Sequence, residues 1–262
     1  MFFDSLLSES IEIPFEIKEN GSEAGLLGTI LFHYFCRQNK LKLTSKKIYL
    51  IRHGQTDFNL QGIVQGSGVD TSLNGRGREQ AMAFFQVYKH VPFDKIYTSA
   101  LKRSFESVQG FIELGLPYEK LSGLNEISWG RNEGQVITPD EDAYYHRMLT
   151  LWGQGETSTR IVGGESPDEV AARQRPAIQH IMSKEEEKTI LICMHGRAIR
   201  ILLCQLMNRP LKDMDSFEHQ NLCLYLLNYT GSSYVIEKHN DVTHLKALNT
   251  QIEVKDISAN LK

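Results

Sequence analysis

Two histidines stand directly after two apolar segments of the chain, and a glycine follows each of them. His53-Gly54 comes after the apolar run at 48–51, and His195-Gly196 comes after the run at 189–194. Glycine lets a backbone approach a ligand closely, and a neutral imidazole can attack phosphorus when its other ring nitrogen is held protonated. A single histidine at the end of a strand is more often structural than catalytic, so the inference depends on the pair.

Arginine accompanies this pair at two places. Arg52 directly precedes His53, and Arg103 comes four residues after a further predicted strand at 94–99. A guanidinium group stays charged and presents a rigid fork of donors that matches a phosphate dianion. Because phosphoryl transfer depends mainly on positioning and on stabilising charge, this set predicts a phosphoryl-transfer site. In such a site one neutral imidazole would attack phosphorus, and the second, protonated, would help to hold the phosphoryl oxygens.

The chemistry requires the segments before these residues to be neighbouring parallel strands, whose carboxyl ends meet at one edge of a sheet. From residue 47 onward, apolar runs alternate with segments of helical periodicity, which is typical of such a sheet. The predicted fold class is therefore α/β: a three-layer sandwich with a mostly parallel central sheet and helices on both faces. The predicted strands are 48–51, 94–99, 189–194, 222–227 and 234–237. One predicted helix covers 105–112, and three others begin after Asn74, after Ser166 and after Gly196.

The first part of the chain has a different pattern. Residues 9–17 alternate in part, with a proline that favours an edge strand, and residues 22–37 predict a helix with one apolar stripe. We therefore expect an accessory amino-terminal strand and helix segment at 1–46, and one main domain at 47–262. The apolar stripe must be buried against the main domain or against a second copy of the chain, which would make a homodimer.

Charge and cysteine content restrict the partners. The 29 Lys and Arg residues against 32 Asp and Glu residues give a net charge of -3, so nucleic acid and acidic membranes gain no overall attraction. The four cysteines have no zinc-ligand spacing and two lie in apolar runs, which favours a reducing compartment. The apolar stretch at 25–35 is too short to span a bilayer, and the start of the chain is not basic. A cytoplasmic protein is predicted.

The order of the motifs resembles that of the histidine phosphatase superfamily, which includes cofactor-dependent phosphoglycerate mutase. The resemblance covers 47 to about 245 and implies the phosphoglycerate mutase-like fold. It is carried by Ile51-Arg52-His53-Gly54-Gln55-Thr56, Asn59, Gln65-Gly66, Leu73-Asn74-Gly75, Ser99-Ala100-Leu101-Lys102-Arg103, Leu124-Asn125-Glu126 with Gly130, Glu133 and Gly134, Gly163-Gly164-Glu165-Ser166, and His195-Gly196.

The resemblance also implies a role for each matching position. His53 would become a phosphohistidine, while Arg52, Arg103 and His195 would clamp the phosphoryl group. Glu126 would protonate the leaving alkoxide and then activate water, a contribution of roughly 10²–10⁴-fold for a well-placed acid. No metal and no cofactor is required. The implied substrate-binding positions are Asn59, Gln65, Gly66 and Gly196.

Several polar residues near these motifs keep two interpretations. Asp57, Gln65 and Glu165 would line the site or only bond their own loops. For Glu133 a structural hydrogen bond is favoured over a role as an alternative acid. Arg197 and Arg200, which flank the second His-Gly pair, are left outside the core set.

The segment at 134–163 separates the candidate activities. A mutase of this family has a long basic insertion there, whereas this segment is short and has Arg147 and Arg160 as its only arginines or lysines. Hydrolysis of a small phosphorylated metabolite by a phosphatase is therefore favoured. The alternatives are a cofactor-dependent phosphoglycerate mutase and a non-catalytic phosphate-binding or partner-binding module.

The same segment contains an apolar and aromatic stripe at helical spacing: Tyr144, Tyr145, Met148, Leu151 and Trp152. Core packing is the favoured interpretation. If part of the stripe faces the pocket, the leaving group is partly apolar.

Overall fold

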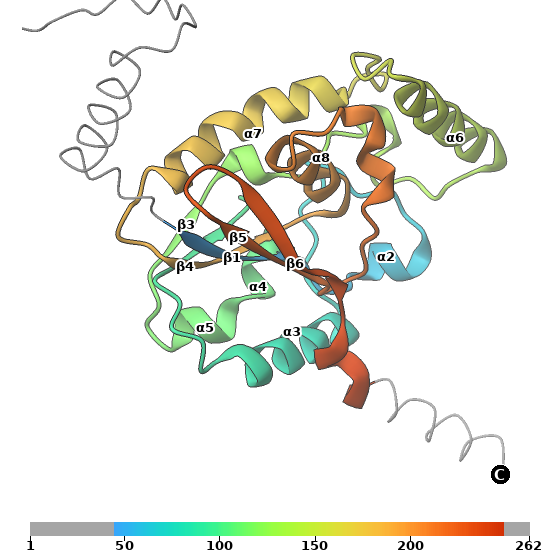
Figure 1. Ribbon diagram of the computed structural model, residues 1–262. Coiled ribbons are helices and arrows are strands. Elements are labelled where there is room, and N and C mark those ends of the chain that lie inside the picture. Colours follow the sequence, from blue (N-terminus) through green and yellow to red (C-terminus); the bar gives the residue numbers. More distant parts are fainter. Residues whose placement is uncertain (1–44, 249–262) are drawn as a thin grey trace, which may run out of the picture. The chain divides into compact units, whose positions relative to one another are not determined.

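The computed structural model describes residues 45–248, and a six-stranded mixed sheet forms the centre of this part of the chain (Figure 1). The strand order is β3-β2-β4-β1-β5-β6. Strands β3, β2, β4 and β1 run parallel, and β5 and β6 continue the sheet in the antiparallel sense. The strands are β1 (Lys46–Arg52), β2 (Lys95–Thr98), β3 (Tyr118–Lys120), β4 (Thr189–Met194), β5 (Leu224–Tyr229) and β6 (Tyr234–Asp241).

Helices cover both faces of this sheet, as the predicted three-layer sandwich requires. Figure 1 shows α7 and α8 on one face and α3, α4 and α5 on the other. The α-helices are α2 (Asp57–Gln61), α3 (Gly75–Tyr88), α4 (Lys102–Glu106), α5 (Gln109–Glu113), α6 (Pro139–Gln154), α7 (Pro167–Met182) and α8 (Gly196–Leu206). Short 3₁₀ helices are η1 (Ser122–Leu124), η2 (Gly130–Asn132), η3 (Leu211–Ser216) and η4 (Thr243–Leu245).

Strand β1 contributes side chains to two separate apolar cores, one on each face of the sheet. Ile48 and Leu50 of β1 lie in the core under α7 and α8, whereas Tyr49 and Ile51 lie in the core that includes Phe84 of α3. Successive side chains of a strand point to opposite faces. A strand that is buried on both faces is therefore apolar along its whole length, which explains the continuous apolar runs in the sequence.

Local capping residues fix where the helices begin. Asn74 accepts a hydrogen bond from the N–H of Gly77 at the start of α3. Ser166 and Glu169 form a capping box at the start of α7, with proline at the first helical position. Both starts agree with the sequence prediction.

The helix predicted over 105–112 is wrong as one element, because the chain forms the two short helices α4 and α5 there. Val108 between them has a non-helical ψ of 8° at φ -118°. The Ser107 hydroxyl donates to the carbonyl of Arg103 and accepts from the N–H of Gly54. This side chain therefore ties the break to the loop that carries His53.

Several predictions concern residues that lie outside the described part of the chain. The strand at 9–17, the helix at 22–37 and the proposed homodimer all fall there, and the domain boundary at 46 remains a prediction. Within residues 45–248, no helix is long and apolar enough to cross a bilayer. The three cysteines of this region, Cys193, Cys204 and Cys223, are buried free thiols.

Candidate active site

The carboxyl ends of β1, β4 and β2 meet at one edge of the sheet, and the two predicted imidazoles lie there together. Arg52 is in register with Met194 on β4, and Thr98 on β2 is in register with Cys193. The chain then continues into His53 and His195, whose rings are 5.1 Å apart between centroids. Both side chains are buried. Residues separated by more than 140 positions thus form one small polar centre.

His53 has the protonation pattern of a nucleophile. Its Nδ1 lies 2.7 Å from the carbonyl oxygen of Gly54. Because a carbonyl only accepts, Nδ1 carries the proton and Nε2 keeps its lone pair. Burial, followed by the charges of Arg103 and Arg52, lowers the pKa of His53 well below the ordinary value. The ring is therefore neutral near pH 7.

His195 accepts a hydrogen bond from Arg103, as a neutral ring does; its protonation during phosphoryl transfer stays a prediction. The Nε of Arg103 donates to its Nδ1 at 3.2 Å, so the ring proton is on Nε2 and points to the hydroxyl of Ser99 at 2.7 Å. Burial, followed by the charge of Arg103, lowers the pKa of His195 well below its ordinary value. Motif spacing gave no sign that a buried guanidinium donates directly to this ring.

Arg103 is fully buried and is held by three different acceptors. Besides His195, it donates from Nη1 to the carbonyl of Val69 at 2.7 Å and from Nη2 to the carbonyl of Gly66 at 3.1 Å. Burial lowers its pKa to about 10, and the nearby Glu126 carboxylate partly offsets that effect. The group is therefore a fixed cation at neutral pH.

Arg52 provides the least satisfied donor of the site. Its Nη1 donates to Nδ1 of His219 at 3.1 Å, whereas its Nε is buried and has no hydrogen-bond partner. Buried donors are normally paired, so an anionic oxygen bound next to this Nε would supply its partner. Burial, followed by the charges of Arg52 and Arg200, lowers the pKa of His219 to about 2. His219 is therefore a neutral acceptor for Arg52.

Glu126 lies beside the paired imidazoles, at the first turn of α8. Its carboxylate accepts hydrogen bonds from the N–H groups of Arg197 at 3.1 Å, Ala198 at 2.9 Å and Ile127 at 2.9 Å. The side chain is only 7% exposed. The structure therefore brings the predicted general acid to the helix that begins directly after His195.

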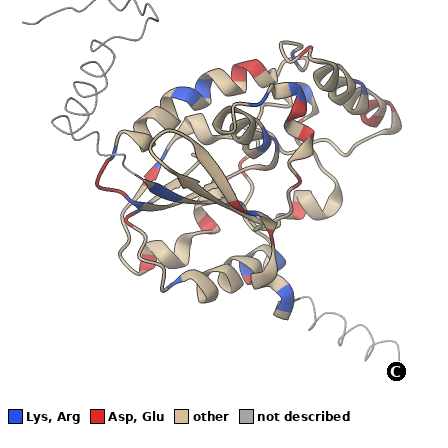
Figure 2. Ribbon diagram, viewed as in Figure 1, with Lys and Arg blue, Asp and Glu red and all other residues tan. Residues whose placement is uncertain are grey.

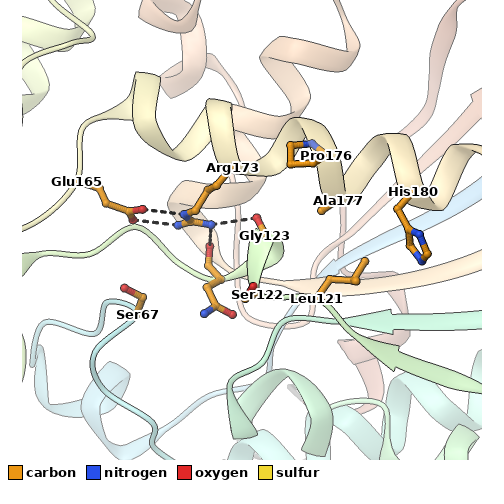
Figure 3. Close-up of a pocket in the computed structure, with 10 residues that line it drawn as sticks. Ser67, Leu121, Ser122, Gly123, Glu165, Arg173, Pro176, Ala177 and His180 are labelled. Atoms are coloured by element: carbon orange, nitrogen blue, oxygen red, sulfur yellow. Dashed lines mark hydrogen bonds and ion pairs between the residues drawn. The ribbon is translucent and has the colours of Figure 1, made fainter.

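Arg173 of α7 fastens the loop that carries Glu126 (Figure 3). Its guanidinium donates to the carbonyl oxygens of Gly123, Asn125 and Glu126, and it forms two bonds with the carboxylate of Glu165. A cavity of about 620 Å³ opens beside this cluster, and none of the five predicted catalytic residues lines it. We interpret Arg173 as a positioning residue for Glu126.

The predicted substrate-binding residues make structural bonds at the rim of the site. The Oδ1 of Asn59 accepts from Asn221 at 3.2 Å, and Asn221 also donates to the carbonyl of His53. The amide of Gln65 donates to the hydroxyl of Thr56 at 2.6 Å and accepts from Thr71. Contact of Asn59 or Gln65 with the substrate remains a prediction.

The two predicted glycines are positions where a side chain has no room. An added Cβ at Gly66 would lie 2.1 Å from the Glu133 carboxylate, and one at Gly196 would lie 2.7 Å from the His219 ring. Glu133 itself accepts from the N–H groups of Gly68 and Trp129 and from the hydroxyl of Ser128. The favoured structural interpretation of Glu133 therefore agrees with its contacts.

The aromatic stripe of α6 packs mainly in the core. Met148 and Trp152 are buried there, and Tyr144 and Leu151 pack against it, as predicted. Tyr144 and Tyr145 also line a second cavity of about 240 Å³. That part of the stripe faces the substrate stays a prediction.

Sequence reasoning missed Arg173, His219 and Asn221. A signal exists for the last two, because both stand just before the strand predicted at 222–227. That strand is antiparallel to β1 and pairs Leu224 with Ile51, so its beginning must lie beside His53. Arg173 lies in the middle of a helix, where nothing in the sequence distinguishes it from a surface arginine.

Within residues 45–248, no group of three His, Cys, Asp or Glu side chains is placed to hold a metal ion. The predicted metal-independent mechanism is not tested by that observation. The chemistry available at the site is that of two neutral imidazoles, two guanidiniums and one carboxylate. Such a set suits the binding and transfer of a phosphoryl group.

Fold and site together define an α/β protein whose imidazole, guanidinium and carboxylate side chains suit phosphoryl transfer. The family model of the histidine phosphatase superfamily (branch 1) matches residues 48–242. The chain belongs to this superfamily, as its motifs had indicated.

Curated relatives share this region of the chain. The 6-phosphofructo-2-kinase/fructose-2,6-bisphosphatase of Gallus gallus is 30% identical over 214 residues, which is 80% of this chain and 43% of that protein. A Bos taurus protein named 6-phosphofructo-2-kinase/fructose-2,6-bisphosphatase 1 is 29% identical over 216 residues, with 81% and 43% covered. The chain thus spans less than half the length of these relatives.

Solved structures with the same fold include two of bacterial origin. A mycobacterial glucosyl-3-phosphoglycerate phosphatase complexed with VO3 has a TM-score of 0.65 and 27% identity, covering 74% of this chain and 98% of that one. YhfR of Bacillus stearothermophilus has a TM-score of 0.66 and 26% identity, with 77% and 100% covered.

Proposed function

We propose that this protein hydrolyses the phosphate monoester of a small metabolite through a phosphohistidine at His53. The observation that carries the proposal is the arrangement of His53: a neutral ring with a free Nε2, 5.1 Å from the His195 ring. The positive charges of Arg103 and Arg52 act on this ring, so an anion bound beside it is stabilised by both guanidiniums.

The first half of the reaction forms a covalent intermediate. The Nε2 lone pair of His53 attacks phosphorus, and the bond from phosphorus to the ester oxygen breaks. Arg52 and Arg103 stabilise the phosphoryl oxygens, while Glu126 in its protonated form gives its proton to the departing alkoxide. The alcohol then leaves, and His53 is phosphorylated.

The second half returns the enzyme to its starting state. Water attacks the phosphohistidine, the Glu126 carboxylate takes one proton from it, and the bond between phosphorus and Nε2 breaks. Inorganic phosphate is released and Glu126 is again protonated. No oxidant, reductant or further reactant is consumed.

The basic residues of the 134–163 segment support hydrolysis over mutase activity. Arg147 is exposed, and Arg160 is paired with Glu169 at the surface. A mutase must retain its phosphoenzyme and rebind a phosphorylated intermediate, for which a further group of cations is needed.

The role of the amino-terminal segment is proposed from its sequence alone. We propose that 1–46 is an accessory to the 47–262 domain, that it mediates a homodimer, and that the protein is cytoplasmic. Light scattering of the full chain and of a chain lacking 1–44 tests the dimer. The same number of chains per particle in both samples would overturn it.

The His53→Ala variant tests the catalytic proposal. We expect turnover of p-nitrophenyl phosphate to fall by on the order of 10⁴-fold or more, because no other group replaces the nucleophile. The control is His90→Ala, which removes an exposed imidazole.

Mass spectrometry of the wild-type protein, quenched during turnover, should find a phosphoryl group on residue 53. Phosphorylation of a different residue, or equal turnover by His53→Ala, would overturn the assignment. Interconversion of phosphoglycerates that depends on 2,3-bisphosphoglycerate, with little phosphate released, would favour the mutase instead.

A further inference from the structure

The cavity of about 240 Å³ between α6 and the loop before it has mostly aromatic and apolar walls. Trp129, Tyr144 and Tyr145 supply the aromatic surface, and Val64 and Ile137 supply the aliphatic surface. The rings of Trp129 and Tyr145 lie 5.3 Å apart between centroids. Since a cavity of roughly 150 Å³ in an apolar protein interior is large enough to bind benzene, this one accommodates a single ring with a short linker.

Two hydrogen-bond connections attach this cavity to the phosphoryl site. Gln65 lines the cavity and donates to the hydroxyl of Thr56, three residues after the nucleophile. On the other wall, Arg197 donates to the hydroxyl of Tyr145 at 3.4 Å, while its own backbone N–H donates to Glu126. None of the five predicted catalytic residues lines the cavity, but these two connections link its walls to the segments that carry His53 and Glu126.

The charges around the cavity do not suit a second phosphate. Glu141 and Asp142 line it, in the acidic first turn of α6 (Figure 2). Among the described residues that line it, none is a lysine or an arginine. The adjacent Arg197 does not line the cavity, and it shares the carboxylate of Asp215 with Arg200, both at 2.5 Å.

The Arg197 guanidinium has a structural position in this wall. It lies 5.7 Å from the ring centroid of the buried Trp152 and is only 4% exposed in its side chain. It donates to the Tyr145 hydroxyl and to the Asp215 carboxylate. These contacts support the aromatic wall.

We propose that this cavity is the leaving-group subsite, and that it takes an aromatic or compact apolar group from a monophosphate that carries no second phosphate. The proposal rests on the proposed function and narrows its substrate class. A bisphosphate is a poor substrate under this proposal. The aromatic walls favour an apolar ring, and the carboxylates of Glu141 and Asp142 repel a second phosphate.

A pair of alkyl phosphates isolates the effect of the cavity. 2-Phenylethyl phosphate and ethyl phosphate both release a primary alkoxide, and they differ mainly in the ring. We expect kcat/KM of the full-length protein to be at least about tenfold higher for the phenyl compound, because discrimination in apolar pockets reaches this size. Fructose 2,6-bisphosphate should be hydrolysed at least about tenfold less efficiently than 2-phenylethyl phosphate, because like charges at the rim disfavour it.

Two variants and a matched control place this preference in the cavity. Trp129→Ala removes one aromatic wall, and Ile137→Asp puts a carboxylate at a half-exposed position that tolerates a polar residue. Both should reduce the ratio of kcat/KM for phenylethyl over ethyl phosphate to about threefold or less. Val87→Asp, which changes a comparably exposed valine on α3, should leave the ratio unchanged.

A binding measurement keeps the two proposals distinguishable. Calorimetry with 2-phenylethylphosphonate and methylphosphonate compares affinity without turnover, and we expect the phenyl compound to bind at least about tenfold more tightly in the wild type but not in Ile137→Asp. Equal kcat/KM for the two phosphates, with His53-dependent turnover intact, would overturn the subsite and leave the phosphatase standing.

If no monoester is hydrolysed, the proposed function fails, and the phosphonates still decide the cavity. Preferential binding of the phenyl compound that Ile137→Asp abolishes would support the subsite. Equal affinities would overturn it.

Discussion

The two halves of the site are built in different ways. The phosphoryl half is made of side chains at the ends of β1, β2 and β4; His53, His195 and Arg103 are buried there, and Arg103 donates to His195. The leaving-group half is made of a loop and α6, and its aromatic residues are only half-buried. The backbone positions of the first half are fixed by sheet register. The second half can change its side chains while the sheet stays intact.

The largest loss is expected for Arg103→Met, which damages the phosphoryl half. Removal of an arginine that stabilises a transferring phosphoryl group lowers kcat by roughly 10³–10⁵-fold. The change also leaves the carbonyls of Gly66 and Val69 without their donor, at a cost of about 1–3 kcal/mol for each unsatisfied buried group. Steady-state kinetics and urea unfolding measure the two effects. The exposed neighbour Lys102→Met is the control, and a loss of similar size there would contradict the assignment.

Glu126→Gln acts where the two halves meet. We expect kcat/KM for ethyl phosphate to fall by roughly 10²–10⁴-fold, the range for removal of a general acid. Turnover of p-nitrophenyl phosphate should change far less, because p-nitrophenolate leaves without a proton.

Equal losses of activity on ethyl phosphate and p-nitrophenyl phosphate would show that Glu126 is not the general acid. Because the new amide faces backbone N–H groups, thermal unfolding is measured alongside to exclude a loss of structure.

Arg173→Met tests whether the loop of Glu126 must be held in place. Small misplacement of a catalytic group can cost up to about 10²-fold, so we expect kcat for ethyl phosphate to fall roughly 10- to 100-fold with little change in KM. p-Nitrophenyl phosphate should again be affected less. Arg175→Met, an exposed arginine of the same helix, is the matched control. A uniform loss on both substrates would indicate a merely structural arginine.

The smallest expected effect is a dependence of stability on pH. His53 and His195 have lowered pKa values in the folded protein, so below about pH 6.5 the unfolded chain binds protons that the folded chain does not. Their stabilising contribution is therefore complete above that pH and is lost as the pH falls, by up to about 1.4 kcal/mol per pH unit for each imidazole.

Urea unfolding at about pH 7.5 and pH 5.5 measures this loss, and His53→Gln should make the dependence shallower. If the free energy of unfolding of His53→Gln depends on pH as steeply as that of the wild type, His53 is not held neutral. For the same reason, the acid limb of kcat/KM should lie below the ordinary histidine range.

Much of the phosphoryl half could be predicted from sequence. Each of its residues stands next to an apolar run, and parallel strands bring their carboxyl ends together by geometry alone. The strands at 48–51 and 189–194 and the helix caps at Asn74 and Ser166 follow the same local rules.

The rest depended on contacts that have no local signature. Arg173 is a helical arginine whose partners are carbonyl oxygens of a remote loop. The neutral state of His195 depends on the direction of one buried donor. The division of 105–112 into two helices depends on the Ser107 hydroxyl, which bonds the loop of residue 54. Such effects arise only once the chain is folded.

The position of β5 beside β1 has a consequence for the order of events during synthesis. Asn221, which bonds the carbonyl of His53, is 168 positions further along the chain, and contacts this distant in sequence form slowly. A nascent polypeptide that has emerged as far as α8 already carries both imidazoles, yet it lacks His219 and Asn221, which bond Arg52 and the backbone of the nucleophile. The proposed activity should therefore begin only after translation has passed the start of β5.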